Sequence, residues 1–139
     1  MKTEDLMIGD WVSIEEPDRY HGYFGEVEII NSVTGYITVS IESHGYHDVF
    51  CDDLRPISLT PEILEKNGFI PNKFNINDVF GTRFDLGNYY YLTFFNSNRG
   101  GSLTKYYTSQ SGFHITTMQY VHELQHALRL CGIEKEIEL

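Results

Sequence analysis

Apolar and polar residues alternate most regularly between positions 36 and 42, where the sequence reads YITVSIE. Ile37, Val39 and Ile41 fall on one side of an extended chain, and the residues between them fall on the other. A period of two residues is that of a β-strand, because successive side chains point to opposite faces of a sheet. The run therefore predicts a strand with one buried face.

Four further short runs in the first part of the chain have the same character. They predict strands at 11–16 (WVSIEE), 26–30 (EVEII), 47–50 (HDVF) and 54–57 (LRPI). Turn signals at 17–18, 31–35 and 43–45 separate them. Several short strands in so few residues predict a small all-β barrel over residues 1–57.

The pattern changes after residue 57. Thr60, Pro61 and Glu62 form a helix-start signal, with threonine at the N-cap, proline at the first helical position and an acid in the first turn. Asn67 and Gly68 form a helix-stop signal. We therefore expect a short helix between these two signals.

Three apolar runs follow, at 79–86, 88–97 and 102–109, and they predict a three-stranded antiparallel sheet. The middle run, NYYYLTFFNS, carries apolar or aromatic residues on both faces. That distribution is typical of a central strand whose two faces are both covered. A tyrosine-lined surface for a ligand or partner is the alternative interpretation of the same run.

An amphipathic helix is predicted at 118–131, where Val121, Leu124, Leu128 and Cys131 recur on one helical face. We expect Thr116 or Thr117 to cap its start and Gly132 to end it. Residues 133–139 (IEKEIEL) alternate apolar and charged positions and predict a last edge strand. Residues 58–139 are thus expected to form an α+β domain, which makes the whole chain α+β.

The first 57 residues resemble SH3-like barrels of the KOW and Tudor kind. The resemblance lies in the order IGDWV, GEVEII, YITVSIE and HDVFCDDLRPI. In those barrels a Gly-Asp opens the first strand, a Gly-x-Val begins the second, and an acidic turn precedes the last short strand. The resemblance implies an N-terminal SH3-like all-β barrel, and it leaves the function open because one fold serves many functions.

Net charge and the absence of targeting signals limit which partners and which location the sequence favours. The net charge is −10, and the first 58 residues hold three basic and twelve acidic side chains, a net charge of −9. Such charge disfavours nucleic acid, whose phosphates require Lys and Arg, and it favours a basic partner. The start, MKTEDLMIGDW, lacks the apolar run of a signal peptide, and no apolar stretch is long enough to span a membrane. We therefore expect a cytoplasmic protein in which Cys51 and Cys131 are thiols.

The stretch HELQH at 122–126 fits H-E-x-x-H. In zinc hydrolases of that pattern, two histidines one helical turn apart hold the metal and the glutamate activates water. A longer form of the motif supplies a third ligand downstream, but Arg129 and Gly132 occupy those places here. The upstream histidines, which would be unusual third ligands, are His21, His44, His47 and His114.

The apolar stripe of the same helix also argues against a zinc site. Val121, Leu124 and Leu128 define the packed face, so we expect His122 and His126 to face solvent. The sequence therefore leads us to assign no catalytic residue, no metal ligand and no cofactor.

The second half resembles a group of small proteins from gut Bacteroidetes. The matching motifs are LTPEIL at 59–64, NGF at 67–69, and Tyr120-Val121-His122 followed by Leu124-Gln125. In that group the positions of Glu123 and His126 often hold Gln and Asn, neither of which could serve a zinc hydrolase. The resemblance implies that the shared feature is a packing and hydrogen-bonding pattern.

A non-catalytic binding or adaptor protein is the leading interpretation. SH3-like barrels commonly present an aromatic groove to a peptide or protein, and the residues that could supply one are Trp11, Tyr20, Tyr23, Phe24 and Tyr46. The alternatives are a zinc hydrolase that uses His122, Glu123 and His126, and a nucleic-acid-binding protein with a KOW-like barrel. In the latter case, phosphate contacts would have to come from Arg83, Arg99 and Lys105.

Overall fold

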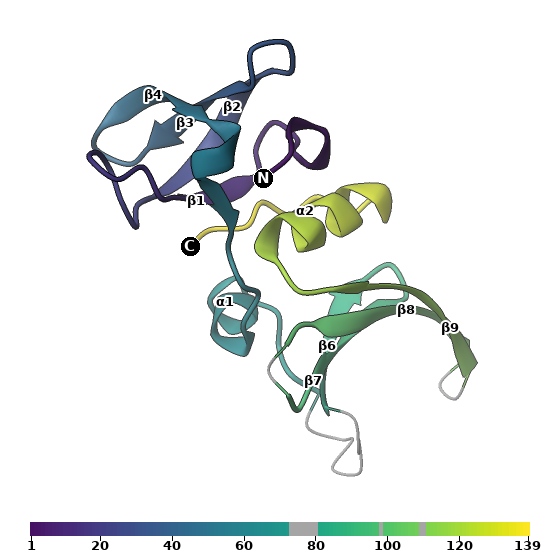
Figure 1. Ribbon diagram of the computed structural model, residues 1–139. Helices are drawn as coiled ribbons and strands as arrows, with labels where there is room; N and C mark the ends of the chain where they lie inside the picture. The colour runs from purple at the N-terminus through teal and green to yellow at the C-terminus, as the bar shows by residue number, and fades with distance from the viewer. Residues whose placement is uncertain (73–80, 98, 109–110) are drawn as a thin grey trace. The chain divides into compact units, whose positions relative to one another are not determined.

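The computed structural model describes residues 1–72, 81–97, 99–108 and 111–139, and the chain divides into two compact units (Figure 1). Unit 1 is Met1–Ile57 and unit 2 is Ser58–Leu139. Antiparallel strands make up two sheets, one in each unit, and the longer helices lie in unit 2. The fold class is therefore α+β, as the sequence predicts.

Unit 1 is a five-stranded antiparallel sheet in the order β4-β3-β2-β1-β5. The strands are β1 (Trp11–Ile14), β2 (Phe24–Asn31), β3 (Tyr36–Ile41), β4 (Gly45–Phe50) and β5 (Leu54–Pro56). Short 3-10 helices lie at Thr3–Asp5 and Cys51–Asp53. All five predicted strands are present, but no pairing of β4 with β5 closes a barrel within residues 1–57, which are described throughout.

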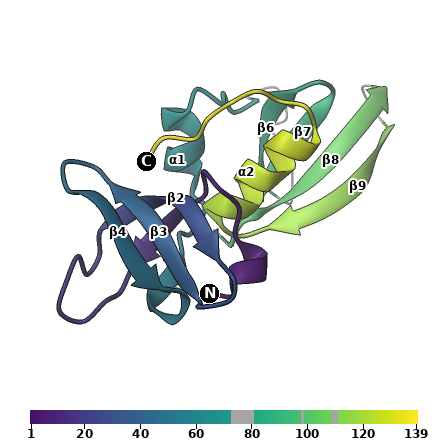
Figure 2. The same cartoon turned by 90° about the horizontal axis from the view of Figure 1, so that it is seen from above.

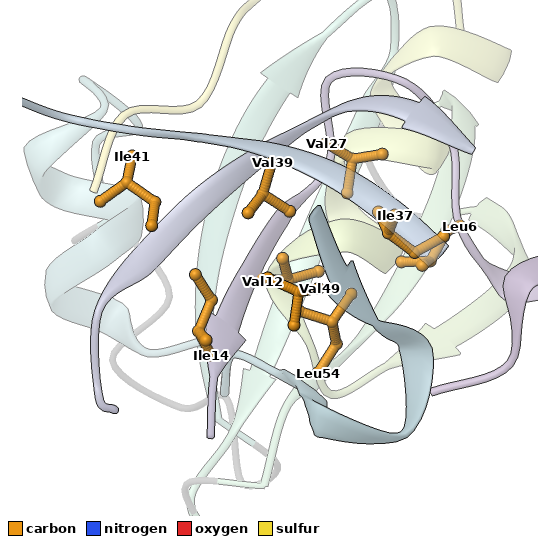
Figure 3. Packing of buried hydrophobic residues seen from close by; sticks show 9 residues of the cluster. All are labelled: Leu6, Val12, Ile14, Val27, Ile37, Val39, Ile41, Val49 and Leu54. Carbon is orange, nitrogen blue, oxygen red and sulfur yellow. The ribbon is translucent and has the colours of Figure 1, made fainter. Parts of the chain in front are cut away.

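Alternating residues of these strands fill the interior of unit 1. Nine buried apolar side chains form the cluster in Figure 3: Leu6, Val12, Ile14, Val27, Ile37, Val39, Ile41, Val49 and Leu54. Val27 pairs with Val39, and Ile37 pairs with Val49, so these side chains lie on the same face of the sheet. The period-two pattern therefore identified the buried face of β3 correctly, whereas in β2 a register shift after Val27 leaves Ile29 exposed.

Unit 2 begins with the short helix α1 (Pro61–Lys66), whose two end signals are used as predicted. The Thr60 hydroxyl accepts a hydrogen bond from the Ile63 amide at 3.3 Å. Asn67 is the C-cap, and Gly68 follows with φ +80°, a left-handed conformation that glycine adopts without strain.

The sheet of unit 2 has four strands rather than the three predicted, in the order β6-β7-β8-β9. They are β6 (Gly81–Gly87), β7 (Tyr90–Phe95), β8 (Gly101–Thr108) and β9 (Ser111–Met118). The start of the predicted strand 79–86 and the end of 102–109 lie outside the described residues. The sequence missed β9 because an extra residue, Ile115, in its pairing with β8 interrupts the period of two.

Strand β7 is central, as predicted, but its two faces are covered to different extents. Leu92 and Phe94 are buried on the face beneath the helix, whereas Tyr91, Thr93 and Phe95 are half-buried on the other. The expectation that both faces are covered is therefore wrong for the face that carries Tyr91, Thr93 and Phe95.

The second helix, α2, runs from Val121 to Leu130, and Val121, Leu124 and Leu128 are buried as predicted. Its start is not capped by Thr116 or Thr117, because both lie in β9. Gly132 follows the helix with φ +68°. No helix within the described ranges is long and apolar enough to cross a membrane.

The residues after α2 are not the predicted edge strand, since 133–139 have no strand assignment. Instead the buried side chain of Asn67 hydrogen-bonds the backbone of this tail. Its amide nitrogen donates to Glu138 O at 2.8 Å, and its oxygen accepts from Glu138 N at 2.8 Å. A single side chain thus supplies the pairing that a neighbouring strand would otherwise supply, and Ile137 is buried beside it.

Candidate functional site

Four rings meet at the edge of unit 1, and we call them the ring cluster: Tyr20, Tyr23, His44 and His47. Tyr20 is central, because its ring centroid lies 5.8 Å from Tyr23, 5.5 Å from His44 and 4.3 Å from His47. Tyr23 and His44 also meet at 5.1 Å. Edge-on and tilted geometries at these distances are the favourable arrangements for aromatic pairs.

Two loops bring these rings together. The tyrosines lie in the loop between β1 and β2, where Tyr20 has φ +51° and Tyr23 N donates to Tyr20 O at 2.9 Å. Gly22 N donates to Ile14 O at 2.7 Å, and Ile14 N donates to Tyr23 O at 2.9 Å. These bonds fold the loop back onto the end of β1 and fix the positions of both tyrosines.

The histidines come from the turn between β3 and β4 and from β4 itself. His44 Nδ1 lies 2.9 Å from Glu42 O, and His47 Nε2 lies 2.9 Å from His44 O. A carbonyl oxygen only accepts, so these ring nitrogens carry the protons. In the tautomer with the proton on Nδ1, His44 Nε2 is an acceptor, and both imidazoles are held in place beside the tyrosines.

The ring cluster is accessible and its surroundings are acidic. Tyr23 is 45% exposed and His44 is exposed, whereas Tyr20 packs partly against the core. The tyrosine loop carries acidic residues at 15, 16 and 18, and the histidine turn carries Glu42. One of these acids, Glu15, pairs with Arg55 at 3.5 Å, and both side chains of this pair remain about half exposed.

The structure separates the five aromatic residues that the sequence suggested for one groove. Tyr20 and Tyr23 belong to the ring cluster, but Trp11, Phe24 and Tyr46 lie on the opposite face of the sheet. Trp11 pairs with Glu26, Glu26 pairs with Ser40, and Ser40 pairs with Tyr46. These positions alternate with the buried residues, so their side chains point away from the core.

Sequence reasoning also missed His44 and His47 as partners of the tyrosines. In the structure His47 is the β4 residue that pairs with Val39, a buried position of β3. Its side chain therefore points to the core side of the sheet, toward Tyr20. The contact could not be foreseen, however, without knowing how the loop between β1 and β2 folds.

The HELQH turn of α2 has a different structure from that expected. His122 is only 7% exposed, and Gln125 is also buried, so the expectation that His122 faces solvent is wrong. The His122 ring stacks on Tyr120, with centroids 5.8 Å apart and an interplanar angle of 11°. The residue before the helix thus covers one side of the imidazole. His126 is half-buried, and its ring meets that of His122 at 5.7 Å.

Glu123 stabilises the start of α2, and it also borders the cavity beside this helix. Its carboxylate accepts hydrogen bonds from Gln119 N at 2.6 Å and from Tyr120 N at 3.1 Å. Amides at the start of a helix have no partner within the helix, so a carboxylate three residues after the N-cap satisfies them. The glutamate that a zinc hydrolase would use as a base therefore caps the helix here.

The part of the chain that the structure describes offers no third metal ligand to the two histidines. Among the described residues, no group of three His, Cys, Asp or Glu side chains is placed to hold a metal ion. His114, the upstream histidine in the same unit, accepts or donates a 2.7 Å hydrogen bond with Ser102 Oγ. It pairs with Thr104, which pairs with Tyr91, so it lies on the sheet face opposite Leu92 and α2.

A cavity of about 240 Å³ lies between α2 and strands β8 and β9. Leu103, Ile115, Met118, Ala127 and Leu130 make it largely apolar, and His126 and Cys131 contribute polar atoms. Burial raises the pKa of the Cys131 thiol, although a hydrogen bond with Tyr90 and the charge of Lys105 act in the opposite direction. The thiol is therefore mainly protonated at neutral pH, which is unfavourable for a nucleophile.

These features differ in what they offer to a ligand. The ring cluster presents exposed aromatic faces beside acidic side chains, and the cavity presents an apolar surface. Within the HELQH turn His122 is buried and Glu123 caps the helix, but Glu123 and His126 also border the cavity. No protein-family model and no curated protein sequence matches this chain.

Proposed function

We propose that this chain is a non-catalytic binding protein whose unit 1 holds a basic, extended segment of a partner protein against the ring cluster. The observation that carries this proposal is the ring cluster itself, in which Tyr23 and His44 remain exposed within an acidic loop and turn. Unit 1 is taken here as an SH3-like fold.

The strand order supports the SH3-like assignment. In β4-β3-β2-β1-β5, the last short strand returns to pair with the first, and a 3-10 turn at Cys51–Asp53 precedes it. This order agrees with the sequence resemblance to KOW and Tudor barrels. In this arrangement the ring cluster joins the loop after β1 to the turn after β3.

The chemistry of the ring cluster suits a guanidinium or ammonium group. The faces of Tyr rings attract cations through their quadrupole, and Arg uses this contact more often than Lys. A net charge of −9 in the first 58 residues draws a positively charged segment toward unit 1. His44 Nε2 and the tyrosine hydroxyl groups add acceptors for its N–H groups.

Titration with synthetic peptides tests the proposal. We expect a short Arg- and Gly-containing peptide to bind the chain with an affinity that falls as salt is added, and a Gln-for-Arg peptide not to bind. Tyr23→Ala should weaken binding about tenfold, because it removes one exposed ring. Tyr46→Ala is the matched control, since Tyr46 is 71% exposed on the opposite face of the same sheet. Equal losses for the two variants, or no binding, would contradict the proposal.

We do not propose a zinc hydrolase. Capping engages Glu123, His122 is buried, and no third ligand approaches among the described residues. Zinc analysis of protein purified without added metal tests this judgement. About one equivalent of zinc that is lost in both His122→Ala and His126→Ala would reverse it.

Nucleic-acid binding is not proposed either, because unit 1 would repel phosphates. Two of the three cations named for phosphate contacts, Arg83 and Lys105, have ring contacts. Arg83 stacks over the Tyr91 ring at 4.1 Å, and Lys105 lies 5.1 Å from the Tyr90 ring centroid. A salt-dependent mobility shift with mixed DNA or RNA would overturn this judgement.

A further inference from the structure

Strand β9 leaves one edge of the unit 2 sheet open. It is eight residues long, and its outer side pairs with no other strand in the described part of the chain. Its sequence, SGFHITTM, contains no Lys, Arg, Asp, Glu or Pro. Exposed edge strands usually carry such residues, which discourage pairing with another chain. This edge therefore lacks the common protection.

The opposite edge of the same sheet is treated differently. Pro71 forms a bridge with Phe84 of β6, and Asn72 N donates to Arg83 O at 2.7 Å. The chain thus covers part of the β6 edge with its own backbone. In Figure 2, β9 is the outermost strand on the other side of the sheet.

The outer side of the β9 edge is competent to pair. A Cβ added at Gly100 would lie 1.9 Å from Met118 O, so that carbonyl points toward the β8 side. Successive carbonyls of an extended chain point in opposite directions, so Gln119 O points outward. It accepts a hydrogen bond from Leu59 N at 2.8 Å, and Ser58 forms a bridge with Tyr120. This short pairing stops beyond β9, and no strand in the described part of the chain pairs with the outer side of Ser111–Met118.

The cavity beside α2 opens along this same strand. Its lining from β9 runs from Ile115 to Met118, and Leu130 of α2, which is 86% exposed, borders it. The volume of about 240 Å³ is sufficient for one large apolar side chain. A strand added to β9 would place alternate side chains over the cavity, as in other cases of strand addition to a sheet edge.

Strand β9 carries a side chain that fits this cavity. Phe113 is 49% exposed and pairs with Lys105, which pairs with Tyr90. Tyr90 hydrogen-bonds Cys131 just after α2, so Phe113 lies on the α2 face of the sheet, the face that bears the cavity. When two copies of an antiparallel strand pair about a two-fold axis, the first half of one lies beside the second half of the other. Phe113 of each copy then falls beside the cavity of its partner.

We propose that the occupant of the β9 edge is a second copy of this chain, so that two unit 2 sheets join through β9 in a symmetric dimer. The strand supplies both the apolar side chain and the cavity that receives it, which a two-fold interface requires. Unit 2 also has a net charge of only −1, so its sheet edges repel weakly. A pairing of this size predicts weak association, with a dissociation constant of about micromolar order.

Sedimentation velocity over a range of concentrations tests the dimer. We expect a monomer–dimer equilibrium that strengthens at about 0.5 M salt, because salt screens the repulsion between two copies of net charge −10. Salt dependence of the opposite sign is expected for the basic peptide at the ring cluster. Phe113→Ala and Ile115→Lys should each weaken dimerisation at least about tenfold. Thr82→Lys on β6 is the control at the opposite edge and should leave it unchanged.

Cross-linking tests the pairing itself and does not depend on how well the charged variant folds. In a Cys51→Ser, Cys131→Ser background, Ile115→Cys should form a disulfide-linked dimer on mild oxidation, because Ile115 lies near the two-fold axis. Thr82→Cys should not. A chain that stays monomeric at about 1 mM in high salt would overturn the proposal, as would a dimer that resists Phe113→Ala and Ile115→Lys.

Discussion

The ring cluster of unit 1 and the HELQH turn of unit 2 use the same residue types, tyrosine and histidine, but in opposite ways. In unit 1 the rings come from two loops, and Tyr23 and His44 remain exposed. In unit 2 the rings belong to consecutive turns of one helix end, and His122 is buried against Tyr120. The HELQH stretch, which looks catalytic in the sequence, thus mainly stabilises the fold. The accessible rings come from the ring cluster, which has no sequence motif.

The difference arises from the backbone groups with which each carboxylate and imidazole forms hydrogen bonds. The amides at the start of α2 lack intrahelical partners, and Glu123 is close enough in sequence to accept from two of them. In unit 1 the backbone of the tyrosine loop bonds to β1, and carbonyls of the β3–β4 turn orient the imidazoles. The rings of Tyr23 and His44 therefore remain exposed.

The largest expected effect compares a buried histidine with an exposed one. His122→Asp should lower the free energy of unfolding by about 3 kcal/mol, because it places a carboxylate in a buried position. His44→Asp, at an exposed position of unit 1, should change it by no more than about 0.5 kcal/mol. Urea unfolding monitored by circular dichroism measures both. Similar losses of unfolding free energy for the two variants would contradict the distinction between the ring cluster and the HELQH turn.

A second comparison concerns two asparagines that bond to the backbone. Asn67→Ala in unit 2 should cost about 2 kcal/mol, because it removes three hydrogen bonds of a buried side chain, two of which hold the backbone of Glu138. Asn31→Ala in the exposed turn of unit 1 removes bonds to Val33 N and Thr34 N, which water can replace, and should cost about 0.5 kcal/mol. The midpoint of urea unfolding distinguishes these values, and an equal shift would show that the tail after α2 is not held by Asn67.

The capping role of Glu123 predicts a smaller effect. Glu123→Ala should destabilise unit 2 by about 1 kcal/mol, since two amides at the start of α2 lose their acceptor. Glu123→Gln should cost less, because the amide oxygen still accepts. Glu134→Ala, at an exposed position after the helix, is the control. A Glu123→Ala variant as stable as this control would argue that the carboxylate is available for chemistry after all.

The smallest expected effect is on thiol reactivity. Burial raises the pKa of Cys131, so at a given pH below that pKa less of the thiol is ionised than in an unfolded chain. Alkylation of Cys131 by iodoacetamide should therefore be slower in the folded chain than in urea at pH 8, and its rate should still increase above pH 9. Mass spectrometry of a Cys51→Ser variant measures this rate. A folded-state rate equal to that in urea would contradict the burial of the thiol.

The sequence determined the local elements of this protein wherever one physical preference dominates. The alternation in YITVSIE fixed which face of β3 is buried, because a strand has a period of two. Thr60 and Pro61 fixed the start of α1, and Asn67 with Gly68 fixed its end. Backbone groups at helix ends have no partner within the helix, and these residue types suit such positions. The apolar stripe of α2 fixed its inward face in the same way.

Only the tertiary structure decided how distant segments use the remaining groups. The sequence could not show that Asn67 pairs with Glu138, that His47 meets Tyr20, or that 111–118 becomes a fourth strand despite its irregular pairing. It could not show that Tyr120 covers His122, since helical periodicity describes one face and not what packs against the others. Each of these outcomes depends on which chain segments lie next to one another in the folded chain. No local pattern in the sequence specifies that.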